Sequence, residues 1–472
     1  MVLESKVLVW CIAGMSGVDI SKRTLIRDLF SKGRVGEEYV VAGWVDAIRV
    51  HGGIVFVILR DRSGRIQLVV KKNVSRDAWR KARDLSLESI VVAKGRLVES
   101  KAALGGRELQ VTELEVLAEA DPLPIDIHEP EKTVLAKRLD WRFLDLRNPR
   151  NQLIFLVEAE MARAARQWFV EHGFVEIFTP KIVGSATEGG AEVFTVVYFD
   201  KPAYLAQSPQ LYKQMGVVAG FEKVFEIGPA FRAEPHHTTR HLTEYTSIDF
   251  EMGFIKSYED VMDVVEGVVK AMIEAAIRKY GDVIREYFPD AWLEPVKEVP
   301  RINIVEAKQL LAKKGKKLSP EEDLDTEAER MVGEIVLEEY ESPLVFVKGY
   351  PWGARPFYTM PCTCTIENPR YPECCKGLRP DTPTCSFDLL FRGLEIATGG
   401  QRQHNPQCLV EQIKQKGLNP ENFKWYIDMF RFGAPPHGGA GIGLERVAMQ
   451  LLGLKNIREA RLVPRDPERL VP

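Results

Sequence analysis

The sequence predicts an α+β protein in which an all-β domain is followed by a larger mixed domain. The chain has 472 residues, which is too many for one ordinary hydrophobic core. Short runs of alternating apolar and polar residues fill 38–117, whereas long helical patterns begin only at 151. A proline-rich segment at 121–130 separates the two patterns.

The composition is that of a globular protein without a strong charge bias. Hydrophobic residues make up 45% of the chain, charged residues 28%, and the net charge is −3. A nucleic-acid partner would therefore have to be met by a local basic patch. No apolar run approaches the length of a membrane span, and seven cysteines, an odd number, argue against a secreted disulfide scaffold. We expect a cytoplasmic protein with no membrane partner.

The first residues leave the true start of the protein open. The short apolar run from Val7 to Met15 could be a weak signal-peptide core or a peripheral strand. Met15 is also a possible initiator, so the real start could lie downstream of Met1. We expect an N-terminal extension at 1–21, a β-domain at 22–120, a linker or hinge at 121–140 and a mixed domain at 141–472.

The β-domain is expected to be a small Greek-key barrel of the OB type. Five strands are predicted, at 39–49, 54–60, 65–70, 90–98 and 109–117. A short helix is predicted after the third strand, at 75–85. Barrels of this type bind single-stranded nucleic acid through aromatic side chains and polar readers. A purely structural barrel is the alternative.

The mixed domain is expected to contain long helices at 151–172 and 257–281. Strands are expected at 174–178, 344–348, 387–396 and 425–431, and the last is followed by a glycine-rich stretch from Gly433 and a helix that begins near Leu444. The glycines would allow close backbone approach, and the helix N-terminus would face an anion. The charged region 285–345 suggests no chemistry. Neither a P-loop motif nor a strand-associated Gly-x-Gly-x-x-Gly is present.

A predicted hairpin from Phe231 to Asp249 carries an unusual set of polar groups. Its guanidinium, carboxylate and aromatic side chains would suit the phosphates, exocyclic amine and base face of a nucleotide. The alternative is an exposed, charged hairpin tip. The polar residues are Arg232, Glu234, His236, His237, Arg240, His241 and Glu244.

Together with three other clusters, this hairpin resembles the class II aminoacyl-tRNA synthetases. The stretches GFVEIFTPKI, FRAE with RHLTEY, and GGAGIGLER match the three motifs of that class in the right order. The stretch QSPQLYK (207–213) is similar to the archaeal/eukaryotic-type aspartyl-tRNA synthetases in particular. The resemblance covers roughly 22–472 and implies a class II catalytic domain, an antiparallel sheet flanked by helices, behind an anticodon-binding barrel.

The resemblance implies an ATP site. Arg232 would hold the α-phosphate, Glu234 would accept from the adenine amino group, and Tyr245 stands where the family usually has Phe under the adenine ring. The β- and γ-phosphates would be met by the glycine-rich helix start and the remaining basic groups, namely Arg240, His241, Gly443 and Arg446. Asp388 and Glu395, on a strand and its continuation, would bind Mg²⁺, with Thr398 where the family often has Ser.

The resemblance also implies an aspartate site, to which Thr398 would contribute. Arg402 would grip the side-chain carboxylate, Lys213 would add a second positive charge, and Asp249 would orient these cations or meet the ammonium. Glu188, on a glycine-flanked loop, would cover the ammonium, and Gln210 would hold the α-carbon end. A neutral asparagine amide would leave two cations underpaired, which would disfavour it.

The function implied is that of an aspartate–tRNA ligase. The ionised α-carboxylate of aspartate would attack the α-phosphorus of ATP, and the adenylate would pass aspartate to the 3′ end of tRNA without a side-chain base. Alternatives are an asparaginyl-tRNA synthetase, or a synthetase paralogue that makes asparagine or only binds RNA. The stretch that matches motif 1 also implies a homodimer.

On the barrel, the resemblance places Phe56 under the central anticodon base, with Gln67 and Glu108 as flanking readers. From the residues alone, Phe56 could equally lie in the barrel core.

Two further barrel positions bear on which tRNA is charged. Archaeal-type enzymes that reject asparagine tRNA resemble one another in a Trp and a Lys, at places that here hold Asp46 and Leu104. Asp46 removes an aromatic ring and adds a charge expected to repel phosphate, and Leu104 removes a donor. We therefore expect a non-discriminating enzyme that charges tRNA-Asp and tRNA-Asn, unless Lys101 or Arg107 supplies the discrimination.

A cysteine-rich insertion at about 361–386 lies outside the resemblance. Its cysteines could form a thiolate metal site, disulfides or free thiols, although the spacing is not that of a standard zinc knuckle. They are Cys362, Cys364, Cys374, Cys375 and Cys385.

Overall fold

The computed structural model describes residues 17–184, 192–235, 238–291, 296, 298–363, 368 and 370–472. The chain divides into two compact units, Met1–Asp126 and Ile127–Pro472. Each unit has its own core, and each is described separately below. The alternatives for the start of the protein fall on 1–16, outside the described residues.

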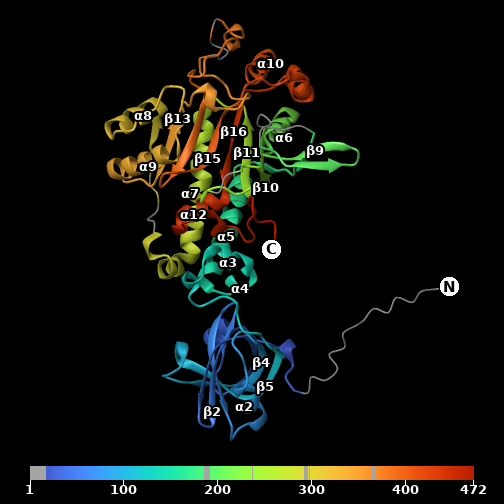
Figure 1. Cartoon of the computed structure of the whole chain (residues 1–472), viewed down its shortest axis with the longest axis vertical. Helices are drawn as coiled ribbons and strands as arrows, with labels where there is room; N and C mark the ends of the chain where they lie inside the picture. The colour runs from blue at the N-terminus through green and yellow to red at the C-terminus, as the bar shows by residue number, and fades with distance from the viewer. Residues whose placement is uncertain are drawn as a thin grey trace, which may run out of the picture. The chain divides into compact units, whose positions relative to one another are not determined.

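The first unit is a closed five-stranded barrel, which confirms the predicted OB-type fold (Figure 1). Val55, Val57 and Leu59 point into the barrel core, and the residues between them point outward, as the two-residue period of a strand requires. Gly52, with φ of 55°, closes the first hairpin. The strands, paired in the order β1-β2-β3-β5-β4, are β1 (Glu38–His51), β2 (Ile54–Asp61), β3 (Gly64–Lys71), β4 (Ile90–Glu99) and β5 (Arg107–Ala118), with helices α1 (Ile26–Lys32) and α2 (Arg76–Arg83).

The second unit is built on an eight-stranded sheet. Neighbouring strands in this sheet are antiparallel except for the two outermost pairs, β12 with β13 and β6 with β10. In order across the sheet, the strands are β12 (Arg301–Asn303), β13 (Leu344–Lys348), β14 (Ser386–Phe391), β15 (Leu394–Gln401), β16 (His437–Gly443), β11 (Glu244–Gly253), β10 (Lys223–Phe231) and β6 (Val175–Glu176).

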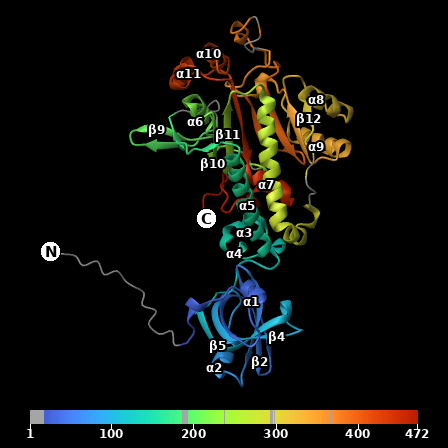
Figure 2. The ribbon, with the colours of Figure 1, turned by 180° about the vertical axis from the view of Figure 1, so that it is seen from behind.

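Two long helices, α5 (Pro149–Glu171) and α7 (Tyr258–Tyr287), lie together against one face of this sheet (Figure 2). Asn148 caps the first helix ahead of Pro149, and Ser257 caps the second in a reciprocal capping box. Their apolar faces share one hydrophobic core with the sheet. This face is therefore closed, and the functional site has to be sought elsewhere on the sheet.

Smaller elements surround the sheet (Figure 1). Helices α8 and α9 flank one edge beside β12 and β13, and a small three-stranded sheet in the order β7-β9-β8 projects near the other edge. The remaining elements are α3 (Leu135–Asp140), α4 (Arg142–Asp145), β7 (Ile182–Val183), β8 (Thr195–Tyr198), β9 (Lys201–Leu205), α6 (Gln210–Gly216), α8 (Ile304–Lys313), α9 (Thr326–Tyr340), α10 (Pro406–Gln415), α11 (Lys424–Arg431) and α12 (Leu444–Leu452).

Two element predictions are wrong. Segment 425–431 is a helix, because Tyr426, Ile427 and Phe430 bury one helical face. Segment 387–396 is not one strand: Arg392 and Gly393 have positive φ and turn the chain back, so β14 and β15 form a hairpin.

The glycine-rich stretch, for which no strand was predicted, forms the sheet strand β16. Gly439 shows why glycine is required there, since a Cβ atom would lie 2.1 Å from the carbonyl oxygen of Phe250 on the neighbouring strand. The helix that follows does begin at Leu444, as predicted.

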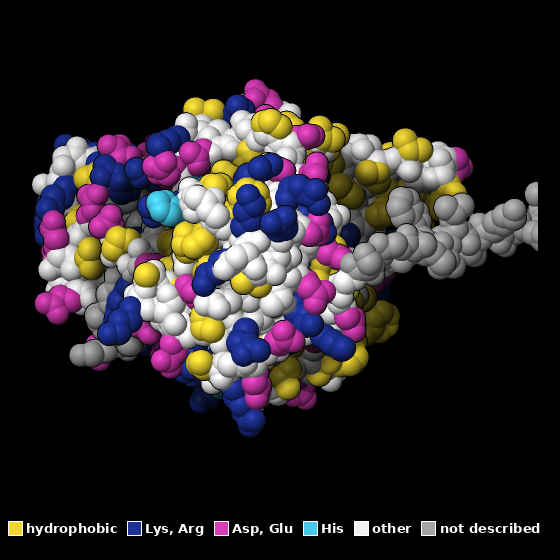
Figure 3. All heavy atoms as spheres, turned by 90° about the horizontal axis from the view of Figure 1, so that it is seen from below, with side chains coloured by type: hydrophobic (Ala, Val, Ile, Leu, Met, Phe, Trp, Pro, Cys, Tyr) yellow, Lys and Arg dark blue, Asp and Glu magenta, His cyan; other side chains and the backbone are white. Residues whose placement is uncertain are grey.

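Lys and Arg side chains are interspersed with Asp and Glu on the face seen in Figure 3. This distribution agrees with the near-zero net charge of −3. Among the helices that the structure describes, none is long and apolar enough to cross a membrane.

Candidate active site

A cavity of about 560 Å³ opens in the second unit. It brings together side chains that are more than 200 residues apart in sequence. Most of the residues expected to bind ATP or aspartate line it: Gln210, Lys213, Arg232, Glu234, Arg240, His241, Tyr245, Asp249, Glu395, Thr398, Arg402, Gly443 and Arg446. Asp388 is not part of the lining, and Glu188 falls outside the described residues.

Sheet register explains why these side chains meet. Strand β16 lies between β11 and β15, and Gly441 pairs with Asp249 on one side and Thr398 on the other. A Cβ atom at Gly441 would lie 3.2 Å from the Asp249 carboxylate. The absent side chain therefore leaves room between the functional groups of the two flanking strands.

In one part of the cavity, the guanidinium of Arg232 lies over the aromatic ring of Tyr245. The Arg232 guanidinium lies 5.6 Å from the centroid of the Tyr245 ring, across the β10–β11 hairpin. Glu234 lies beside Arg232, with a closest nitrogen–oxygen distance of 3.8 Å. An aromatic face, a planar cation and a carboxylate acceptor within one hairpin suit a purine and its first phosphate.

A second group of basic residues comes from the loop between β10 and β11 and from the start of α12. Arg240 donates to Glu329 at 2.7 Å, and Arg446 donates to the backbone oxygen of Glu395 at 2.8 Å. Burial lowers the pKa of His241 to about 4, and the nearby charges of Arg446 and Arg240 act in the same direction. His241 is therefore neutral at neutral pH in the nucleotide-free site, and the positive charge for a polyphosphate comes from the arginines.

Glu329 was missed by the sequence reasoning. It belongs to α9, within the region that suggested no chemistry, and it is buried beside the arginines. Burial raises the pKa of Glu329 to about 7, and the charge of Glu395 adds to this effect. Only the folding of α9 against the sheet brings this carboxylate to the site, so no local signal in the sequence points to it.

The expected metal ligands lie on neighbouring strands of the β14–β15 hairpin. Asp388 pairs directly with Thr398, and Glu395 precedes Thr398 on β15. Burial raises the pKa of Asp388 to about 6. Burial alone would raise the pKa of Glu395 too, but the charges of Arg446 and Arg232 hold it below its ordinary value.

The donor set fits a hard divalent cation. Two carboxylates and a hydroxyl supply oxygen ligands of the kind Mg²⁺ takes in combination with substrate phosphates. The Asp388 Oδ1 atom is buried and has no hydrogen-bond partner among the residues that the structure describes. Such an orphaned carboxylate oxygen is what a missing cation would leave. The other oxygen, Oδ2, accepts from Arg355 at 2.7 Å.

At the amino-acid end, two cations are matched by two buried carboxylates. Lys213 donates to Asp249 at 2.7 Å and lies 3.6 Å from Glu251. Arg402 donates to Glu251 at 2.9 Å and to the side-chain oxygen of Gln210 at 3.1 Å. Glu251 is 0% exposed and was missed, although it stands two residues after Asp249 on β11, on the same side of the strand.

This arrangement corrects the expected reason for selection against asparagine. Lys213 and Arg402 would not be left underpaired by a neutral ligand, because Asp249 and Glu251 already balance their charges. If the site does select against asparagine, the selection would have to come from the direction of the Lys213 and Arg402 N–H donors. These can bond a carboxylate oxygen but cannot accept a hydrogen bond from an amide N–H.

A chain of hydrogen bonds supports α6 and β16 behind this end. Tyr426 donates to Gln214 at 2.9 Å, and the Gln214 amide meets His437 Nε2 at 2.8 Å. His437 Nδ1 lies 2.9 Å from the backbone oxygen of Pro435, which assigns the ring proton to Nδ1. Burial lowers the pKa of His437 to about 4, so the ring is a neutral member of the network.

In the barrel, the three expected anticodon readers share one outer face. Val55 and Val57 point into the core, so Phe56 points outward. Gln67 donates to Glu108 at 3.0 Å across the parallel β3–β5 pair. The structure thus settles the side of the barrel on which Phe56 lies, while its contact with RNA stays a prediction.

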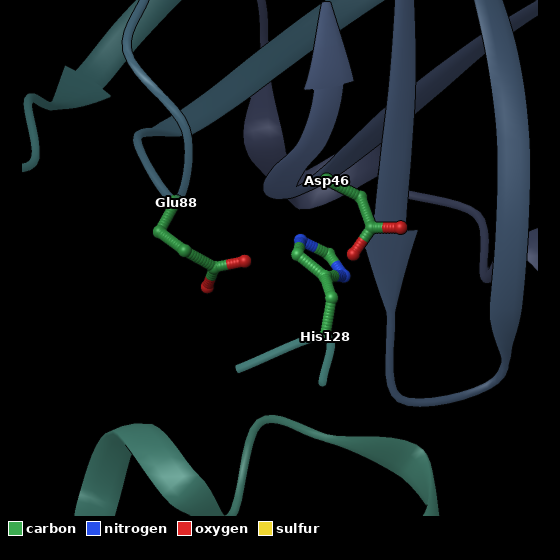
Figure 4. A group of neighbouring side chains, drawn as sticks. All are labelled: Asp46, Glu88 and His128. Atoms are coloured by element: carbon green, nitrogen blue, oxygen red, sulfur yellow. The ribbon is translucent and has the colours of Figure 1, made fainter. Parts of the chain in front are cut away.

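The two positions tied to tRNA discrimination differ in their exposure to solvent. Leu104 is 54% exposed, whereas Asp46 is only 7% exposed. Asp46 forms ion pairs with Arg60 and, at 3.0 Å, with Arg65. Arg60 also pairs with Glu88. Figure 4 shows the side chains of Asp46 and Glu88, the latter on the loop before β4. The argument that Asp46 would repel phosphate is therefore wrong, because its charge is neutralised within the barrel.

The cysteine-rich insertion contains disulfides in the structure. Cys362 is bonded to Cys385, and Cys375 is bonded to Cys408 of α10, a cysteine that the sequence reasoning left out. Cys364 lies outside the described residues. Among the residues that are described, no group with metal-ligand spacing includes a cysteine.

Comparison with known proteins agrees with this geometry. The family model for class II tRNA synthetases (D, K and N) matches residues 135–467, and that for the OB-fold nucleic acid binding domain matches 39–117. The chain is 50% identical to an aspartate–tRNA(Asp/Asn) ligase from Aeropyrum pernix, over 93% of this chain and 96% of that protein. It is 45% identical to an aspartate–tRNA(Asp) ligase from Pyrococcus abyssi, over 93% and 97%.

Two solved structures are similar over nearly the whole chain. A putative aspartyl-tRNA synthetase from Leishmania major Friedlin has a TM-score of 0.86 and 30% identity, covering 97% of both chains. The asparaginyl-tRNA synthetase from Pyrococcus horikoshii, complexed with asparaginyl-adenylate, has a TM-score of 0.84 and 34% identity, covering 93% of this chain and 97% of that one. From the barrel, the cavity and these relatives together, the chain belongs to the class II tRNA synthetases of the D, K and N group.

Proposed function

We propose that the chain is an aspartate–tRNA ligase, which activates L-aspartate with ATP and transfers it to the 3′ end of tRNA. The observation that carries the proposal is the buried Lys213–Arg402 pair, which provides directed donors for a side-chain carboxylate at one end of the cavity. Arg232 and Arg446 lie along the same cavity, where ATP would bind. The aspartate ligases among the relatives, at 50% and 45% identity, support the same substrate.

The chemistry needs positioning and charge neutralisation instead of a side-chain base. The α-carboxylate of aspartate is ionised at neutral pH and attacks the α-phosphorus in line, with pyrophosphate leaving. Arg232 would neutralise charge that develops on the transferred phosphorus, and Arg240 and Arg446 would hold the leaving phosphates. Asp388, Glu395 and Thr398 would hold Mg²⁺, which when bound neutralises phosphate charge.

Pyrophosphate exchange tests this assignment. The purified chain should incorporate labelled pyrophosphate into ATP when aspartate is present, and asparagine or lysine should support little exchange. Exchange that depends on asparagine would instead favour an asparaginyl-tRNA synthetase, such as the Pyrococcus horikoshii protein to which this chain is similar. Without aspartate-dependent exchange, the proposal would have to be abandoned.

We also propose that the enzyme charges both tRNA-Asp and tRNA-Asn. The absent aromatic ring at Asp46 and absent donor at Leu104 support this, as does the Asp/Asn name of the Aeropyrum pernix relative. Against it, the Pyrococcus abyssi relative is named for tRNA(Asp) alone. Unmodified transcripts of both tRNAs should be aspartylated with similar efficiency. A preference above about a hundredfold, roughly 2.7 kcal/mol, would show that discrimination is intact.

A homodimer is proposed from the apolar surface near α5 and β6. Val175 and Phe178 are exposed in the segment that matches the first motif of the class, and Val170 is exposed just before it, in α5; Phe178 is 84% exposed. Large apolar side chains exposed close together in the sequence are what a subunit interface would cover. Sedimentation should give a mass near twice 53.4 kDa. A mass near 53.4 kDa throughout the micromolar range would contradict the dimer.

For the insertion, we propose the disulfides Cys362–Cys385 and Cys375–Cys408. The first would close the insertion on itself directly before β14, and the second would tie it to α10. A thiol count under denaturing conditions, together with elemental analysis, tests this. Four titratable thiols at these positions, or a stoichiometric metal, would contradict the disulfides.

A further inference from the structure

Arg355 has no role in the function described so far, yet it lies at the expected metal site. It follows the short turn Trp352–Ala354 and lines the cavity. Its guanidinium donates to Asp388 at 2.7 Å and to Thr398 at 3.2 Å. Two of the three expected metal ligands are thus engaged by one arginine.

The arginine is held there by its surroundings. Its guanidinium carbon lies 3.8 Å from the centroid of the buried Tyr350 ring. The preceding turn is held by Lys416, whose ammonium donates to the backbone oxygens of Trp352 at 2.8 Å and Gly353 at 3.1 Å. A side chain that is stacked, paired and anchored through its turn occupies a defined position instead of sampling many.

Charge around the metal site is therefore balanced before any cation arrives. Arg355 compensates Asp388, and Arg446 lies 3.4 Å from the Glu395 carboxylate. A divalent cation that approached these carboxylates alone would meet two arginine charges at contact distance. The phosphates of ATP carry enough negative charge to reverse this balance, so the cation becomes favourable only with nucleotide.

We propose that Arg355 is the resident counter-ion of Asp388 and makes divalent-metal binding at this carboxylate depend on nucleotide. Arg355 is then a positioning residue that acts on the metal through Asp388. The inference rests on the proposed ATP-dependent function. With this arrangement the metal enters together with the nucleotide, and the metal-binding carboxylates stay paired with arginines when no nucleotide is bound.

Mn²⁺ binding to the nucleotide-free full-length protein, followed by electron paramagnetic resonance, tests the proposal. Arg355→Met removes the charge but keeps an aliphatic stem, whereas Arg355→Lys keeps the charge. The Met variant should bind Mn²⁺ at least tenfold more tightly than the wild type, and the Lys variant should not. Adding Asp388→Asn to the Met variant should abolish the gain. Equal Mn²⁺ affinity in the Met variant and the wild type, within about twofold, would overturn the proposal.

A second measurement needs no substitution at Arg355, in case the Met variant does not fold. The complex of wild-type protein with a non-hydrolysable ATP analogue should bind Mn²⁺ at least tenfold more tightly than the protein alone, and at least tenfold more tightly than the analogue alone. Tight Mn²⁺ binding by the wild type without nucleotide, lost in Asp388→Asn, would refute the inference. Pyrophosphate exchange is a separate readout, so failure of the proposed function and failure of this inference can be told apart.

Discussion

Replacing Arg402 by lysine should weaken aspartate binding much more than ATP binding. Arg402 is buried and donates to Glu251 at 2.9 Å, to Gln210 at 3.1 Å and to the backbone oxygen of Gly439 at 2.8 Å. These bonds hold the plane of the guanidinium, which is the group proposed to grip the aspartate side chain. A lysine keeps the charge but has a single nitrogen and no planar fork.

The size of the effect follows from the donors that are lost. A lysine ammonium cannot serve both a substrate carboxylate and all three of the present acceptors, so we expect the net loss of about two charge-assisted hydrogen bonds. At about 1.5 kcal/mol each, this is about 3 kcal/mol, or roughly a hundredfold in the KM for aspartate. The KM for ATP should change by less than about threefold, because the nucleotide contacts are elsewhere in the cavity.

The assay is pyrophosphate exchange with aspartate and ATP varied in turn. Arg392→Lys is a matched control, because Arg392 also donates to backbone oxygens, those of Gln450 and Ala291, but does not line the cavity. The control should leave both KM values unchanged. If Arg402→Lys raised the KM for aspartate less than about fivefold, or raised both KM values equally, Arg402 would not be the side-chain anchor.

Three further outcomes are expected. Arg446→Ala should lower exchange by about a hundredfold or more while the melting temperature stays within a few degrees, and near-normal exchange would refute its phosphate role. Tyr245→Phe should leave the KM for ATP unchanged, whereas Tyr245→Ala should raise it about tenfold through lost stacking, and equal effects would refute the stacking. Burial lowers the pKa of His437 to about 4 in the folded state, whereas in the unfolded chain the pKa of this histidine is about 6.5. Between these two pH values the unfolded chain binds a proton that the folded state does not. The free energy of unfolding, measured in urea, should therefore fall by about 2 kcal/mol from this group between pH 7 and pH 5, and His437→Gln should lack that part.

The barrel could be predicted almost element by element because its signals are local. Alternation along 54–60 and the turn residues at Asp61–Gly64 fix both the strands and their connection. The side of the barrel on which Phe56 lies follows from the same period of two, once the register is known. The linker region could be seen only as a change of composition.

In the catalytic unit, the residues that match motifs could be placed, but those that support them could not. Glu251 had a local signal, since it follows Asp249 by one strand period. Glu329 and Arg355 had none, because they reach the site from α9 and from a loop through tertiary packing. The glycine-rich stretch that forms β16 gave no strand signal, because glycine is rare in strands, and only the neighbouring backbone explains its glycines.

The most direct test of the proposed function is the attachment of labelled aspartate to tRNA by the purified full-length chain. With ATP and Mg²⁺, an unmodified tRNA-Asp transcript should become charged with aspartate at its 3′ end, and asparagine or lysine should not be attached. Aspartate-dependent pyrophosphate exchange without any charged tRNA, or charging with asparagine in place of aspartate, would contradict the assignment of this chain as an aspartate–tRNA ligase.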